Sequence, residues 1–171
     1  VYSVEVGMGL PNFASAAVPM LNVTPEAAEA GEVVDQPYSI AGGSFRITCL
    51  SMGNPHCVIF VDDVDAVDVG RFGPALERAP IFPRRANISF AQALSATLFR
   101  VRVWERGIGE TRSCGTAACA VAAAAVKLGF SPMDRDIQIN LPGGQIIIRL
   151  TENGLKMTGD AQRDFEGDIE I

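Results

Sequence analysis

The sequence predicts an α+β fold in which a barrel-like, mostly antiparallel sheet is wrapped around a central apolar helix. Two observations support this prediction. Residues 115–128 are rich in alanine and contain no helix breaker, which favours a helix, and a helix that is apolar all round must be buried all round. Many short segments with strand-like patterns fill most of the remaining chain, and many short strands with one buried helix are typical of this class.

The expected elements follow in chain order. Residues 69–78 have the pattern of an amphipathic helix, and Gly129 is a natural left-handed stop for the central helix. Pro19 weakens a strand at 18–23, and residues 24–35 fit either a short surface helix or a mobile loop. Apolar patterns bounded by turn residues indicate strands at 2–8, 38–41, 44–51, within 52–61, and at 86–91, 97–104, 136–141, 145–151 and 154–159, with a last strand expected at Ile169 and Ile171.

Length and composition restrict the class of protein. The 171 residues are enough for one domain, 1–171, with its own core, and the net charge of −6 without a basic run argues against a nucleic-acid partner. No apolar segment is long enough to cross a bilayer, so we expect no membrane association. Val1 is not a methionine and a strand begins directly after it, so we expect the sequence to be part of a longer protein.

The cysteines do not have the spacing of a metal site. They stand at positions 49, 57, 114 and 119 without a Cys-x-x-Cys pair, and His56 is the only histidine, so no zinc site is expected. Reduced thiols in the cytoplasm are the simplest interpretation. His56 and Cys57 are neighbours on a strand and point to opposite faces, so they are a poor catalytic pair.

Cys114 lies where the central helix begins. The unpaired backbone N–H groups and the dipole of a helix N-terminus favour negative charge, so we expect a lowered pKa for this thiol. The N–H groups of Gly115, Thr116 and Ala117 are suited to hold a carboxylate. A reactive thiol beside such a site is what proton abstraction next to a carboxylate needs. A structural cysteine beside a core helix explains this stretch equally well.

Five segments, in order, resemble the second half of the diaminopimelate epimerases: 52–58 (Met-Gly-Asn-Pro-His-Cys-Val), the segment around Asn87, 104–111, 114–119 (Cys-Gly-Thr-Ala-Ala-Cys) and 157–161. The resemblance covers nearly the whole chain and is weak at 12–35 and in the final residues. That family has two pseudo-symmetric domains, each a barrel-like sheet around a central helix, as predicted above. The resemblance implies that this chain is the C-terminal domain and that its N-terminal domain is a partner absent from the sequence.

The resemblance also implies a cofactor-independent reaction, with neither pyridoxal phosphate nor a metal. The family inverts one α-carbon of LL-diaminopimelate to give the meso isomer, a precursor of lysine and of peptidoglycan. One cysteine thiolate removes the α-proton and a second thiol returns a proton on the opposite face. Cys114 would be one of the pair, and the other would come from the missing domain. Cys119 stands five positions further along the helix, so we expect it to pack in the core.

Binding roles follow from the resemblance as well. Gly115 and Thr116 would bind the substrate's α-carboxylate through their backbone N–H groups. Without the resemblance, the residue types alone favour a surface ion pair between Glu105 and Arg106, and a turn role for Asn54. The resemblance instead assigns the distal carboxylate to Arg106, the distal amino-acid end to Asn54 and Asn87, and the tuning of thiol protonation to His56 and Glu105.

Two departures and several alternatives complete the sequence-based view. Ala117 replaces a frequent glycine and Asp160 a frequent proline, and neither position carries an assigned role. Related isomerases resembling proline racemase or the phenazine-biosynthesis enzymes share the fold. From other classes, a Cys–His acyl hydrolase would use Cys114 and His56, and a non-catalytic domain would only bind a carboxylate. A homodimer is a further candidate assembly, and the fragment alone is predicted to be inactive.

Overall fold

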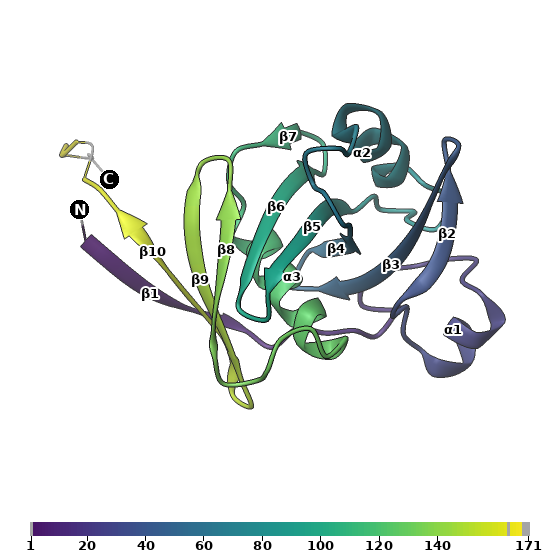
Figure 1. Ribbon diagram of the computed structural model, residues 1–171, viewed down its shortest axis with the longest axis horizontal. Coiled ribbons are helices and arrows are strands. Elements are labelled where there is room, and N and C mark those ends of the chain that lie inside the picture. Colours follow the sequence, from purple (N-terminus) through teal and green to yellow (C-terminus); the bar gives the residue numbers. More distant parts are fainter. Residues whose placement is uncertain (1, 164, 169–171) are drawn as a thin grey trace.

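The computed structural model describes residues 2–163 and 165–168 (Figure 1). Its elements are β1 (Tyr2–Gly9), α1 (Pro25–Ala30), β2 (Gln36–Ile40), β3 (Gly43–Ser51), β4 (Pro55–Phe60), α2 (Val69–Glu77), β5 (Asn87–Ser95), β6 (Leu98–Glu105), β7 (Gly109–Thr111), α3 (Gly115–Lys127), β8 (Asp136–Leu141), β9 (Gly144–Thr151) and β10 (Gly154–Ala161).

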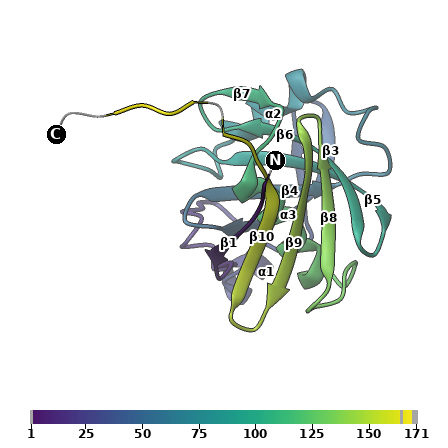
Figure 2. The ribbon, with the colours of Figure 1, turned by 90° about the vertical axis from the view of Figure 1, so that its left-hand side faces the viewer.

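All ten of these strands belong to one curved sheet. Its order is β1-β10-β9-β8-β6-β5-β4-β3-β2, with β7 paired to β6. The pairs β4–β5 and β6–β8 are parallel, and the other neighbours are antiparallel. Helix α3 contacts strands from both halves of the sheet, including β3, β4, β5, β8, β9 and β10. Figures 1 and 2 show the sheet bending around this helix, which confirms the predicted fold class.

Helix α3 is buried as the sequence predicts. Residues 117–125 are all 1% exposed or less, and Gly129 follows the helix with a positive φ of 77°. Alanine side chains project little from a helix, so the backbones of the surrounding strands can approach it closely. The inner core therefore consists of α3 and the inward faces of the strands, with Phe99, Val101 and Val103 contributed by β6.

A second core covers the outer face of β3, β4 and β5. Cys49, Cys57, Ile59 and Phe90 lie there, packed against residues of α2 that include Leu76. The central strands are thus buried on both faces, which explains the apolar pattern of β4 on both sides.

Local capping settles the segment that the sequence left undecided. Thr24 precedes α1, and its Oγ1 accepts a hydrogen bond from the backbone N–H of Ala27 at 3.3 Å, while Gly31 ends the helix in the left-handed region. Residues 18–23 form turns and irregular structure. The predicted strand at Ile169 and Ile171 lies outside the described residues.

β1 and β10 extend from the body as a two-stranded arm, at the left of Figure 1. Seven of the eight residues of β1 are exposed, among them Tyr2, Val4 and Val6.

Within the described part of the chain, no helix has the length and apolar composition needed to span a bilayer.

Candidate active site

The site is built around the N-terminal end of α3. Cys114 occupies the N-cap position in an extended conformation and is half-buried, with Sγ 3.6 Å from the hydroxyl oxygen of Thr116. Gly115 lies against β10, since a Cβ at this position would be 2.9 Å from Sδ of Met157. The helix end is therefore packed on one side while the thiol keeps access to solvent. A sulfur fully enclosed by hydrocarbon would have excluded acid–base chemistry.

The pKa of Cys114 differs from the sequence-based expectation. Burial raises the pKa of this thiol, and the nearby Glu105 carboxylate raises it further. The nearby Thr116 hydroxyl and Ala117 backbone N–H lower the pKa, as groups at a helix N-terminus should, but they do not compensate. The predicted lowered pKa is therefore wrong for this chain, and Cys114 is a protonated thiol at neutral pH.

Glu105 reaches the thiol from the end of β6. The hydroxyl of Thr111 on β7 donates a hydrogen bond of 2.6 Å to Oε1 of Glu105. The pairing of β6 with β7, in which Glu105 lies opposite Gly109, orients this carboxylate. Sequence reasoning selected Glu105 but missed Thr111, whose role depends on the short β6–β7 hairpin.

Arg106 follows Glu105 and is exposed. Its backbone N–H donates to Oδ1 of Asn87 at 2.9 Å, and its Nη1 donates to the carbonyl oxygen of Arg84 at 3.3 Å. Among the ion pairs of the described residues, none joins Glu105 to Arg106, so the surface ion pair that the residue types allow is not formed.

A hydrogen-bonded chain connects His56 to the helix end. Nε2 of His56 lies 2.9 Å from Oδ1 of Asn54, and Nδ2 of Asn54 donates to Oγ1 of Thr116 at 3.3 Å. Because the Asn54 amide donates to Thr116, its oxygen accepts the proton on Nε2 of His56. Thr116 in turn lies beside Cys114, so His56 reaches the thiol only through two intermediate side chains.

His56 is a neutral, fully buried side chain. Burial lowers its pKa to about 4, with a further contribution from the charge of Arg106. Among the described residues, its Nδ1 has no hydrogen-bond partner. Cys57 belongs to the outer core, while His56 points to the other face, toward Asn54, which contacts Thr116 of α3, as predicted for neighbours on a strand. The structure thus brings His56 to the site but places it next to Asn54 and not next to the thiol.

Asn87 connects two parts of the site. It is 4% exposed and begins β5 opposite His56 of β4. Its Nδ2 donates to the carbonyl oxygen of Pro55 at 3.0 Å, and its Oδ1 accepts the N–H of Arg106. Asn87 therefore connects the beginning of β4 to the turn after β6 through its side-chain hydrogen bonds.

Two further features set limits on the site. Cys119, like Cys49 and Cys57, is fully buried, and burial raises the pKa of Cys119 to about 12, so it is the inert core residue that the sequence predicts. Among the described residues, no group of three or more histidine, cysteine, aspartate or glutamate side chains is arranged to hold a metal ion.

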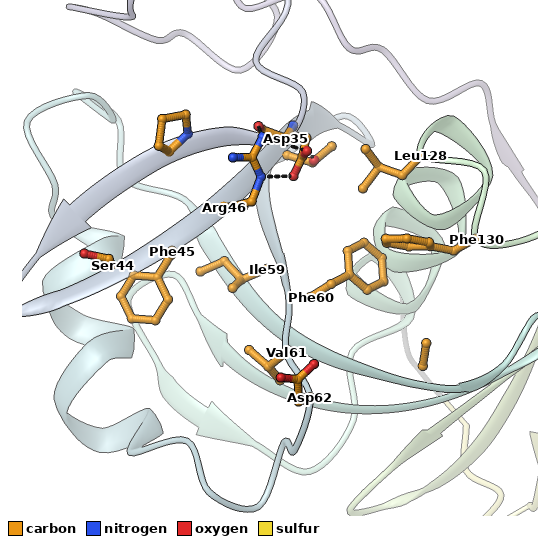
Figure 3. A pocket seen from close by; sticks show the side chains of 13 residues that line it. Asp35, Ser44, Phe45, Arg46, Ile59, Phe60, Val61, Asp62, Leu128 and Phe130 are labelled. Carbon is orange, nitrogen blue, oxygen red and sulfur yellow. Dashed lines mark hydrogen bonds and ion pairs between the residues drawn. The ribbon is translucent and has the colours of Figure 1, made fainter.

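A separate groove lies at the opposite end of α3. It has a volume of about 830 Å³, and Phe45, Phe60 and Phe130 line it beside the Asp35–Arg46 ion pair (Figure 3). None of the predicted site residues lines this groove.

Comparison with solved structures gives the class of the fold. A structure described as a predicted epimerase from Pseudomonas aeruginosa matches 92% of this chain and 55% of its own, with a TM-score of 0.55 at 18% identity. A probable proline racemase from Agrobacterium radiobacter matches 74% of this chain and 46% of its own, with a TM-score of 0.51 at 16% identity. The domain thus has the fold found in epimerases and racemases.

Sequence comparison gives the particular family. The sequence model described as diaminopimelate epimerase matches residues 48–163. The diaminopimelate epimerase of a Synechocystis strain is 46% identical over 98% of this chain and 59% of its own length, and that of Moorella thermoacetica is 42% identical over 100% and 59%. The chain belongs to the diaminopimelate epimerase family and spans a little under three fifths of the length of these relatives.

Proposed function

We propose that this chain is the C-terminal domain of a protein that interconverts LL- and meso-diaminopimelate, and that it supplies one of two acid–base cysteines. The observation that carries this proposal is the half-buried thiol of Cys114 at the N-terminal end of α3. The chain's membership of the family supports the substrate and the reaction.

The protonated state of Cys114 suits the role of proton donor. A thiolate from the other domain would take the α-proton, leaving the electron pair on a planar α-carbon next to the carboxylate. Cys114 would then form the new C–H bond from the opposite face and become the thiolate. The backbone N–H groups of Gly115 and Thr116, directed outward at the helix end, would hold the α-carboxylate and stabilise the developing negative charge.

The remaining site residues would bind the distal end of the substrate. Arg106 is exposed and uses Nη1 on a carbonyl, which leaves guanidinium donors for a carboxylate. Asn54 lies between His56 and Thr116, and Asn87 supports the backbone of Arg106. In this arrangement His56 acts on the site through Asn54, and Glu105 acts on Cys114 directly.

The second half of the site would come from another domain of the same protein. The relatives are longer than this chain, and the exposed apolar side chains of the β1–β10 arm are suited to contact such a domain. A homodimer and a cytoplasmic location stay predictions from the sequence.

Hydrogen exchange in deuterated water tests the proposal. The intact protein is given LL-diaminopimelate, and NMR follows loss of the α-proton together with formation of the meso isomer. We expect Cys114→Ser to lower the rate by a factor on the order of 10³, because the general acid is lost. Cys119→Ala, in the core, is the control that should retain activity. The 171-residue chain alone should not invert the substrate. Inversion by the intact Cys114→Ser variant at the parental rate would disprove the role of this thiol.

The variant Arg106→Gln tests the distal end separately. We expect a rise in KM for diaminopimelate of about 100-fold, because a charge-assisted hydrogen bond to the distal carboxylate is worth about 1.5–3 kcal/mol. A substrate without a distal carboxylate should bind the variant and the parent equally. An unchanged KM for diaminopimelate would assign the distal end to other residues and favour a racemase of smaller amino acids.

The geometry does not favour an acyl hydrolase. A Cys–His nucleophile needs the imidazole within hydrogen-bonding reach of the thiol. Nε2 of His56 is instead bonded to Asn54, and its lowered pKa, about 4, makes it a weak base. A domain that only binds a carboxylate remains compatible with the fragment, and inactivity of the intact protein in the exchange experiment would favour it.

A further inference from the structure

Glu77 is a buried carboxylate that the proposed mechanism does not use. It lies in the last turn of α2 and is 2% exposed. Oε2 accepts the indole N–H of Trp104 at 2.9 Å, and Oε1 accepts the backbone N–H of Gly107 at 2.9 Å. Nη1 of Arg85 lies 3.5 Å from Oε1. A carboxylate out of water is costly unless its oxygens are paired, so these partners decide whether Glu77 can be charged.

The partners keep Glu77 ionised. Burial alone would raise its pKa, but the hydrogen bonds from Trp104 and Gly107, together with the charges of Arg78 and Arg85, bring the pKa below its ordinary value. Glu77 is therefore a carboxylate at neutral pH, and both of its oxygens accept hydrogen bonds.

The face of α2 that carries Glu77 packs closely against the end of β6. Gly73 is one helical turn before Glu77, and a Cβ on Gly73 would be 2.6 Å from Cγ of Trp104. The indole ring therefore packs directly against the α2 backbone, and Glu77 binds its N–H from the same face. Trp104 cannot move without disturbing α2.

The two donors to Glu77 flank the two proposed site residues. Trp104 comes directly before Glu105, and Gly107 comes directly after Arg106. Between them, Asn87 accepts the N–H of Arg106. The backbone of this turn is thus held at successive points, while the Glu105 carboxylate acts on Cys114 and the Arg106 guanidinium is exposed.

We propose that Glu77 is a positioning residue that holds the turn 104–107, so that Glu105 faces Cys114 and Arg106 faces the distal end of the substrate. The second half of this statement rests on the proposed function. The first half concerns only this chain and can be tested without substrate.

The test is the pH profile of Cys114 alkylation in the 171-residue chain. Iodoacetamide labelling is followed by peptide mass spectrometry, which separates Cys114 from the three buried cysteines. If Glu77→Gln releases the turn, the Glu105 charge moves away from the thiol, and the midpoint of the profile falls. At neutral pH the labelling rate should then rise about two- to fivefold, since one pKa unit changes the thiolate fraction tenfold.

Three further variants make the result specific. Glu105→Gln should lower the midpoint at least as much, and the double variant Glu77→Gln/Glu105→Gln should equal Glu105→Gln alone, because Glu77 acts through Glu105. Arg85→Gln removes one charge near Glu77 but leaves both hydrogen bonds to Glu77 in place, so it is the matched control, and its labelling rate should rise clearly less than that of Glu77→Gln.

Trp104→Phe covers the case in which Glu77→Gln does not fold. It keeps the carboxylate and an aromatic ring beside Gly73 but replaces the indole by a smaller ring without the N–H donor, so a smaller fall of the midpoint is expected. An unchanged midpoint in the folded variants overturns the proposal. Faster labelling at every pH with the same midpoint also overturns it, because that result means general loosening. Since no substrate is present, failure of the epimerase assignment would not affect either outcome.

Discussion

The middle of α3 and its N-terminal end contain the same kind of small residues but have different surroundings. Residues 117–125 are enclosed by strands on every side, and no side chain among them is more than 1% exposed. At the N-terminal end, Cys114 is half-buried and lies near Thr116, Glu105 and, across Gly115, Met157. The first region can only contribute to stability, whereas the second has a titratable group with access to solvent.

Cys114, at the N-cap of α3, and Cys119, inside the helix, show this difference directly. Cys119 is fully buried and its pKa is raised to about 12, whereas the pKa of Cys114 depends on burial, on the nearby Thr116 hydroxyl and Ala117 N–H, and on the Glu105 charge. Both residues are cysteines, but Cys114 is the N-cap of α3 and Cys119 lies inside the helix. Packing around each thiol, together with its position at the end or inside the helix, therefore decides how exposed it is and how far its pKa is raised.

The largest expected effect is on the enclosed region. Ala122→Leu inserts three carbons where strands surround the helix, so the free energy of unfolding should fall by about 3 kcal/mol. Urea denaturation followed by circular dichroism measures this. Ala28→Leu, on an exposed position of α1, is the matched control and should change stability by less than about 0.5 kcal/mol. Equal effects at the two positions would contradict the enclosure of α3.

The N-terminal end should depend on pH where the middle does not. His56 has a folded pKa of about 4 against an ordinary value of 6.5, so the unfolded chain binds the proton more readily. The contribution of neutral His56 to the free energy of unfolding is fully present above pH 6.5 and is lost as the pH falls toward 4. Between pH 7 and pH 5 the free energy of unfolding should fall by about 2 kcal/mol.

The variant His56→Gln provides the control for this pH dependence. Glutamine keeps a donor for Asn54 and does not titrate, and the chain has no other histidine. Its unfolding free energy should be nearly constant over the same range. If the parent and the variant lose the same stability, the dependence comes from other groups.

Serine substitutions compare the two cysteines with one change of atom. Cys119→Ser places a hydroxyl in the inner core and should lower the free energy of unfolding by about 1 kcal/mol. The hydroxyl can donate to a backbone carbonyl of the preceding helical turn, but its own oxygen finds no donor in the apolar core. Cys114→Ser puts the hydroxyl in a half-exposed N-cap position that favours serine, so stability should be unchanged or slightly higher. Thermal unfolding of both variants measures the difference, and a larger loss at Cys114 would reverse the comparison.

A small loss of stability is expected at the other end of α3. Nζ of Lys127 lies 2.7 Å from Glu32 and 5.1 Å from the centre of the Phe13 ring, and its side chain is partly exposed. Lys127→Gln should therefore cost only about 0.5 kcal/mol and should do so mainly at low salt. A loss of several kcal/mol would show that substitutions at the ends of α3 destabilise the fold as much as substitutions in its middle.

The sequence was sufficient for features that depend on local pattern. An uninterrupted alanine run followed by Gly129 predicts α3 nearly to the residue, and the apolar pattern of residues 97–104 predicts the strand that becomes β6. The sequence left segment 24–35 undecided because threonine and glycine also occur in loops. Only the structure shows that Thr24 accepts the N–H of Ala27 and that Gly31 has the positive φ of a helix C-cap.

The sequence was not sufficient where distant segments meet. Glu77 fits the pattern of a surface residue at the end of an amphipathic helix, and nothing nearby in the chain indicates that Trp104 and Gly107 will bury it. Likewise, the helix N-terminus correctly predicts the groups that lower the pKa of Cys114, but the larger opposing effects come from burial and from Glu105 on another strand.

By itself the sequence determined the central helix, most of the strands and the identity of the thiol at the helix end, because periodicity, propensity and short motifs are properties of neighbouring residues. Only the tertiary structure decided the protonation state of that thiol, the neutral state of His56 and the buried position of Glu77. Those depend on solvent exclusion and on charges within a few ångströms, and both are set by segments that lie tens of residues apart in the chain.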